Sequence, residues 1–229
     1  MEMRSPADAA HFNFIRAIAV LLAIGAIAFS GCQSVYYEAM EKMGTHKRDI
    51  LVDRVEEGKE AQEEARAQFS SAFDEFLAVS EVDLGDLKSA YERIQDSFDR
   101  SEKRAKAVRD RIDSIKSVSK ALFKEWEAEL GQYTNQELRQ ASEDQMNQTR
   151  ILYLKLIGAM EEAAESMDPV LNAFRDQTLF LKHNLNAQAV AALNKTSLGL
   201  RDEVDLLIQQ MSESIEEANA FIVKMRSGG

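Results

Sequence analysis

Residues 87–126 read LKSAYERIQDSFDRSEKRAKAVRDRIDSIKSVSKALFKEW, and this stretch decides the fold of the chain. Apolar or small residues recur along it at alternating spacings of four and three, and charged residues fill most of the other positions. The stripe consists of Leu87, Tyr91, Ile94, Phe98, Ser101, Ala105, Val108, Ile112, Ile115, Ser119, Leu122 and Trp126. A heptad pattern sustained over this length predicts a long helix packed along a narrow seam.

Three other segments carry stripes of the same kind. The first runs through Leu51, Val55, Gly58, Ala65, Phe69, Phe73 and Phe76; another through Leu138, Leu152, Leu156, Met160, Ala163 and Met167; and the last through Leu193, Leu200, Val204, Leu207, Met211, Ala218, Phe221 and Met225. Four helices of roughly 40 to 50 residues, each about 60–75 Å long, follow from these stripes. Short turns between helices of similar length imply antiparallel neighbours. The expected fold is therefore all-α, an elongated antiparallel four-helix bundle with coiled-coil-like packing.

Turn signals separate the stripes at three places. Residues 80–86 (SEVDLGD) and 131–135 (GQYTN) combine glycine with residues that cap helices, and residues 184–186 (NLN) are the best candidate for the third turn. Thr45 is a candidate cap for the first long helix. Residues 168–169 (DP) either kink the third helix or start a new one, and a kink is the expected outcome.

The N-terminal region has the pattern of a lipoprotein signal peptide. Arg16 precedes an apolar run of 13 residues at 17–29, which as a helix is about 20 Å long and too short for a hydrocarbon core of about 30 Å. Ser30 and Gly31 then precede Cys32, the only cysteine. The predicted organisation is a removed signal peptide (1–31), a lipidated tether (32–44) and a helical bundle domain (45–226), with Cys32 as the lipidation site. The alternative is an uncleaved membrane anchor, because the charged region before the run is long and Phe29 is unusual for such signals.

Composition limits the classes of partner. The net charge is −11, and the charges before Cys32 cancel, so the chain without its leader remains acidic. An acidic body is repelled by phosphate backbones, and nucleic acid is therefore not an expected partner. Ten glycines and two prolines in 229 residues favour helix nearly throughout.

Few residues suggest chemistry. His46, Asp49 and Asp53 share a helical face by their spacing and are weak candidates for a divalent-metal site, with an ordinary exposed polar face as the alternative. The chain lacks the HExxH, ExxH, phosphate-loop and GxSxG patterns, so neither an enzyme nor a cofactor is expected.

The segment 169–192 is richer in polar groups than its surroundings. Its candidate partner surface consists of Arg175, Asp176, Lys182, His183 and Asn184. The alternative is a polar cluster that only caps and pins the third turn.

Three strings carry a family resemblance: SGCQS at 30–34, GTHKRDILVDRVEEGKEAQ at 44–62 and PVLNAFRDQTLFLKHNLNAQA at 169–189. With these the chain resembles an uncharacterised family of proteobacterial all-helical lipoproteins that carry a domain of unknown function. Some members are labelled "DNA repair ATPase", but the resemblance brings no activity with it. The label is consistent with similarity to long coiled coils, because the chain has the helices without a nucleotide-binding head.

The function expected from the sequence is that of a non-enzymatic cell-envelope lipoprotein that acts as a helical spacer or docking module. It would be held to the membrane by lipid on Cys32, and Gln33 after the cysteine is compatible with the outer membrane, facing the periplasm. A protein partner is expected, and self-association is left open. The alternative is a periplasmic bundle that binds a ligand or a divalent metal, and ATP-linked DNA repair is the least favoured function.

Overall fold

The computed structural model describes residues 46–79 and 86–227, with side chains at all of these positions except 187–192 and 194–198. These residues form helices α2 (Lys47–Ala78), α3 (Leu87–Leu130), α4 (Gln136–Glu165), α5 (Met167–His183) and α6 (Ala187–Ser227). The described ranges contain no strand, and the all-α prediction is confirmed. Residues from Arg48 onward belong to one compact unit.

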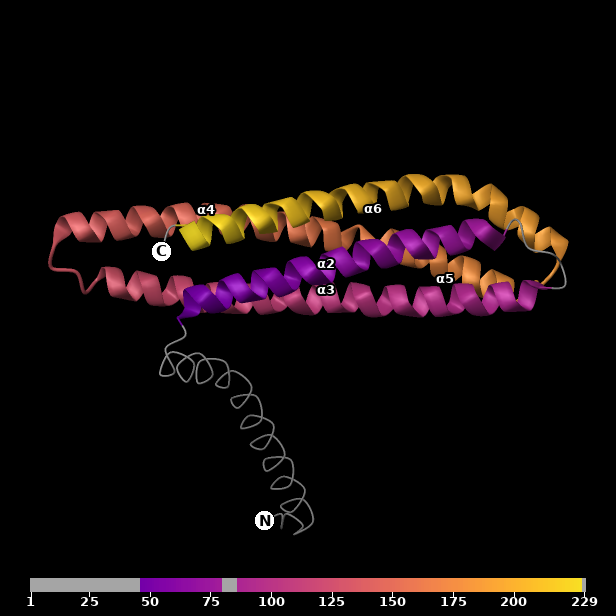
Figure 1. Ribbon diagram of the computed structural model, residues 1–229, viewed down its shortest axis with the longest axis horizontal. Helices are drawn as coiled ribbons and strands as arrows, with labels where there is room; N and C mark the ends of the chain where they lie inside the picture. Colours follow the sequence, from indigo (N-terminus) through magenta and orange to yellow (C-terminus); the bar gives the residue numbers. More distant parts are fainter. Residues whose placement is uncertain (1–45, 80–85, 228–229) are drawn as a thin grey trace, which may run out of the picture. The chain divides into compact units, whose positions relative to one another are not determined.

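Within this unit the helices form an antiparallel four-helix bundle, in which α4 and α5 together make the third rod (Figure 1). Ion pairs and a hydrogen bond give the order around the bundle. They join α2 to α3 (Glu57–Arg111), α3 to α4 (Lys116–Glu161), α4 to α6 (Lys155–Glu217) and α6 to α2 (Ser214–Gln62). Each helix therefore packs between two antiparallel neighbours.

The predicted stripes make the core. All members of the α3 stripe are buried except Tyr91 and Trp126, which are half-buried. The α2 and α6 stripes are buried along their whole length. Across the centre, the ring of Phe174 from α5 stacks on that of Phe76 from α2, with centroids 4.5 Å apart.

The α4 stripe holds from Leu156 to Met167, but Leu138 was wrongly placed in the core, because its side chain is 59% exposed. The ion pair between Lys155 and Glu217 sets the register of α4 against α6, and in this register α6 ends level with Gln145. Leu138 lies beyond that level, where α3 and α4 are the only described helices that continue (Figure 1).

A small separate core holds this projecting hairpin together. Its buried members are Phe123, Leu130 and Met146, with Trp126 and Tyr153 packed against them. The indole N–H of Trp126 donates to Ser142 Oγ at 2.9 Å, which ties α3 to α4.

The turns at 131–135 and 184–186 lie where the sequence predicted them. Asn135 caps α4, since its side-chain oxygen accepts from the backbone N–H groups of Glu137 and Leu138 at 2.9 and 3.2 Å. The candidate cap Thr45 and most of the turn at 80–86 lie outside the described residues.

Two helix lengths differ from the prediction. The first helix has 32 residues, and the third is divided at Ser166 into helices of 30 and 17 residues, where a single kinked helix was expected. Pro169 has no N–H to donate to the carbonyl of Glu165, so the ladder is interrupted there. Ser166 keeps right-handed helical angles (φ −68°, ψ −12°), and α5 therefore continues the course of α4.

Candidate functional site

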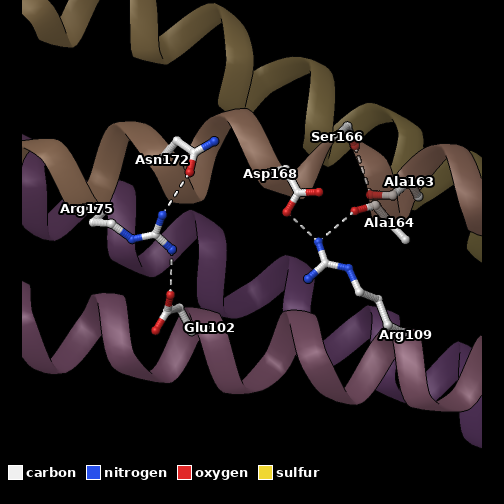
Figure 2. A network of polar contacts seen from close by, with 8 residues as sticks. All are labelled: Glu102, Arg109, Ala163, Ala164, Ser166, Asp168, Asn172 and Arg175. Atoms are coloured by element: carbon white, nitrogen blue, oxygen red, sulfur yellow. Dashed lines mark hydrogen bonds and ion pairs between the residues drawn. The ribbon is translucent and has the colours of Figure 1, made fainter.

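The junction between α4 and α5 is bridged by Arg109 of α3 (Figure 2). Its Nη2 donates to Asp168 Oδ1 at 2.6 Å and to the backbone carbonyl of Ala164 at 3.4 Å. The guanidinium therefore lies at the C-terminal end of α4 and beside an acidic residue in the first turn of α5. The cation at the C-terminal end of α4 and the carboxylate of Asp168 in the first turn of α5 are each favourable for the dipole of their helix.

Two further side chains stabilise the junction. Ser166 Oγ donates to the carbonyl of Ala163 at 2.9 Å. Two turns along α5, Arg175 donates to Glu102 of α3 at 2.9 Å and to Asn172 at 3.0 Å, as Figure 2 shows. The guanidinium of Arg175 also lies 5.6 Å from the ring centroid of Phe98, within cation–π range.

An open pocket of about 280 Å³ lies beside Arg109, between α3 and the α4–α5 junction. Its lining consists of Arg109, Ile112, Asp113, Lys116, Glu161, Ala164, Glu165 and Asp168. Lys116 donates to Glu161 at 2.7 Å, and this hydrogen bond and the charge of Glu161 raise the pKa of the ammonium group above its usual 10.5.

The pocket carries more negative than positive charge. Arg109 and Lys116 are each committed to a carboxylate, and within the described part of the chain Asp113 and Glu165 form no ion pair. Because Ile112 and Ala164 supply an apolar lining, the pocket is suited to an aliphatic chain that ends in an amine or a guanidinium.

The residues of the predicted partner surface lie on α5 and at its end, but they do not act as one group. Arg175 is engaged with Glu102 and Asn172, whereas Asp176, Lys182 and His183 are exposed. Asn184 caps α5, since its side-chain amide donates to the carbonyl of Phe180 at 2.9 Å. This hydrogen bond is of the kind that the capping alternative describes. Leu179, Phe180 and Leu185 are exposed apolar side chains at the same end.

His46, Asp49 and Asp53 are exposed. Across residues 46–79 and 86–227, no group of three or more histidine, cysteine, aspartate or glutamate side chains is placed to hold a metal ion. Cys32 lies outside the described residues, so its lipidation stays a prediction.

The sequence interpretation identified Pro169 as a point of interruption but missed Arg109 and the pocket. Arg109 is 59 residues from Asp168, and nothing in the local pattern links them. One pattern in the sequence could have indicated an acidic site here. Glu161, Glu165 and Asp168 repeat at spacings of four and three, which places all three on the outward side of the third rod.

None of the described helices combines the length and the apolar character that crossing a membrane requires. Comparisons with curated proteins and with solved structures find no match to the chain. Residues 36–225 match the family described as "Protein of unknown function (DUF2959)". This match spans most of the sequence and includes every helix from α2 to α5 and nearly all of α6. The chain therefore belongs to the DUF2959 family.

Proposed function

We propose that this protein is a non-enzymatic lipoprotein of the bacterial cell envelope, in which lipid on Cys32 holds a rigid helical bundle that serves as a spacer and docking module. The observation that carries the proposal is the length of the bundle. The 44 residues of α3 span about 66 Å, and every member of their stripe from Ile94 to Leu122 is buried. A helix supported along its whole length keeps its ends at a fixed separation.

The sequence supports the anchor. Cys32 follows a short apolar run and two small residues, and a cysteine in this context is the acceptor in lipoprotein signals. Because one acyl chain gives only marginal membrane binding, the several chains of a mature lipoprotein matter for stable attachment. Gln33 is compatible with a place in the outer membrane, facing the periplasm, because in bacterial lipoproteins that resemble this chain an aspartate after the cysteine tends to hold the protein in the inner membrane.

The surface supports docking. Many charged side chains of neighbouring helices form ion pairs with each other, whereas Ile151 and Leu154 of α4 are exposed by 68% and 59%. Apolar side chains that are exposed next to each other on an otherwise charged surface are typical of sites that a partner covers.

Metabolic labelling with a fatty-acid analogue, followed by membrane fractionation, tests the proposal. The wild-type chain should take up label and fractionate with the outer membrane, and Cys32→Ser should do neither. Gln33→Asp is the matched control, because it keeps the thiol; it should retain the label and move to the inner membrane. An unlabelled wild-type chain that fractionates like Cys32→Ser would overturn the proposed anchor.

A further inference from the structure

The outward side of α4 carries apolar side chains that no described helix covers. Ile151 and Leu154 are 68% and 59% exposed, and they lie on the opposite side of α4 from the buried Leu156 and Met160. Residues 151–160 (ILYLKLIGAM) contain one charged side chain, Lys155, and apolar or small residues around the rest of the helix. A helix that is apolar on nearly all sides is typical of a covered segment.

Gly158 lies on the same outward side, one turn after Leu154. No heavy atom lies within 4 Å of the position that its Cβ would occupy, so nothing inside the bundle requires a glycine there. A glycine in a helix interior is destabilising relative to alanine. A glycine at this exposed position would let the backbone of another helix approach α4 closely from outside the bundle, and this would explain why it is present.

This patch continues into the acidic pocket. The outward stripe consists of Ile151, Leu154, Gly158, Glu161, Glu165 and Asp168, at spacings of three and four. Such spacing is the geometry along which another helix packs. The stripe is apolar in its first half and acidic in its second, and the acidic half borders the pocket between α3 and the junction.

We propose that this outward stripe, Ile151 to Asp168, is the docking surface for an amphipathic helix of a partner protein, with apolar residues in one half and lysine or arginine in the other. Apolar side chains of the partner would pack on Ile151, Leu154 and the open space at Gly158. A basic side chain would enter the pocket, where its charge meets Asp113 and Glu165. The inference deepens the proposed docking role and rests on it.

Charge argues for a basic partner over a second copy of the chain. An antiparallel copy related by a two-fold axis at Leu154 would place its Glu143 opposite Glu165, which sets like charges against each other. A basic helix instead neutralises the two carboxylates that have no ion pair in the described structure.

Binding of synthetic helical peptides to the full chain in detergent tests the proposal. Each peptide has about 18 residues, or five turns. Two probes carry a leucine stripe in one half and lysine and arginine in the other, in opposite orders, because the direction of docking is not fixed. There are two control peptides. One has the same composition as the probes in scrambled order, and the other has glutamate in place of lysine and arginine. One ordered probe should bind about ten-fold more tightly than either control, and more weakly as salt is raised.

Matched variants locate the binding. Leu154→Glu and Glu165→Lys should each weaken it by about ten-fold or more. Val223→Glu and Glu203→Lys make the same changes at exposed positions of α6 and should leave it unchanged. All four positions are exposed, so circular dichroism should show the same helix content in every variant.

Three outcomes would overturn the docking surface: equal binding of all peptides, binding that Leu154→Glu does not weaken, or a wild-type dimer that Leu154→Glu dissociates. The last would identify the face as a self-interface. Cys32→Ser should bind the probe like the wild-type chain. Failure of the proposed anchor and failure of this surface are therefore seen in separate experiments.

Discussion

Ser214 Oγ donates a hydrogen bond to Gln62 Oε1 at 2.9 Å, and both side chains are fully buried between α6 and α2. Each residue lies in a stripe that is otherwise apolar. A shift of one helix by a heptad would bury both polar groups without a partner, at a cost of about 1–3 kcal/mol for each. The pair therefore favours a single register of α2 against α6, in the way that one buried polar residue does in coiled coils.

The energetic coupling of this pair can be measured. Ser214→Ala should lower the free energy of unfolding by about 1–3 kcal/mol, because it leaves Gln62 Oε1 buried without a donor. Adding Gln62→Leu should restore most of that loss, since Nε2 of Gln62 has no hydrogen-bond partner among the described residues of the wild-type chain. Urea unfolding of both single variants and the double variant gives the coupling energy.

The exposed Ser227 supplies the control for this cycle, and Ser227→Ala should change stability by less than about 0.5 kcal/mol. Additive effects of the two core substitutions would show that the pair does not set the register.

Phe174 should be the most sensitive position on α5. Its ring is fully buried and lies 4.5 Å from Phe76 and 6.4 Å from Phe69, measured between ring centroids. Phe174→Ala should destabilise the bundle by about 3–5 kcal/mol, because the third rod is held to α2 through this contact. Phe180→Ala, at a position 41% exposed, is the control and should cost much less in the same thermal or urea unfolding experiment. Similar losses for both variants would contradict the packing described here.

The stripes show which features of the fold can be predicted from the sequence pattern. Periodicity alone predicted the four antiparallel rods, and nearly all of the stripe residues of α2, α3 and α6 are buried. The α2 stripe left a gap between Gly58 and Ala65, and the α6 stripe left one between Met211 and Ala218. The structure fills both gaps with polar residues, Gln62 and Ser214, which bond to each other. Pairing across 152 positions of sequence depends on the register of two helices, which a single stripe does not specify.

The errors in α4 have a similar cause. Leu138 has the correct phase for the core, but phase does not say where the neighbouring helices end. The pocket beside Arg109 was missed for the same reason, since it forms from two helices that are brought together only by the fold. The sequence thus predicted which side of each helix is buried, and the relative lengths of the helices decided what covers it.

Two glycines of opposite environment give a paired prediction. A Cβ at Gly58 would lie 2.8 Å from Ile115 Cδ1 and 2.9 Å from Met160 Cε, whereas a Cβ at Gly158 meets open space. Gly158→Ala should raise the free energy of unfolding by roughly 0.5–1 kcal/mol, because alanine loses less backbone entropy on folding. Gly58→Ala should gain less than this or lose stability, since both neighbouring side-chain ends must move. Equal gains in urea unfolding would show that the core at Gly58 is loosely packed.

The Lys116–Glu161 pair predicts a stability difference that depends on pH. The pKa of Lys116 is raised by its hydrogen bond to Glu161. The contribution of this ion pair to the free energy of unfolding is therefore fully present below pH 10.5 and is lost as pH rises through the higher pKa of the folded state. Lys116→Gln should melt at a lower temperature than wild type near neutral pH, and the difference should shrink above pH 10.5. Lys103 lies on the exposed side of α3 and forms no ion pair with a described residue, so Lys103→Gln removes the same charge and should show no such change. A difference that stays constant across this range would exclude the pair as its source.

Arg109 should control local opening at the α4–α5 junction more than global stability. Its ion pair with Asp168 is exposed, with 40% and 62% of the two side chains accessible, and exposed pairs contribute about 1 kcal/mol or less. Arg109→Gln also removes the donor that reaches the carbonyl of Ala164 beside the interrupted ladder. Amide hydrogen exchange should therefore accelerate in residues 163–172 and remain unchanged in α6.

Lys106→Gln breaks an exposed pair with Asp110 inside α3 and is the matched control, because it should leave the junction as protected as in the wild-type chain. Faster exchange spread evenly over the bundle would mean that Arg109 supports the whole core, and unchanged exchange at 163–172 would mean that Pro169 and Ser166 define the junction without it.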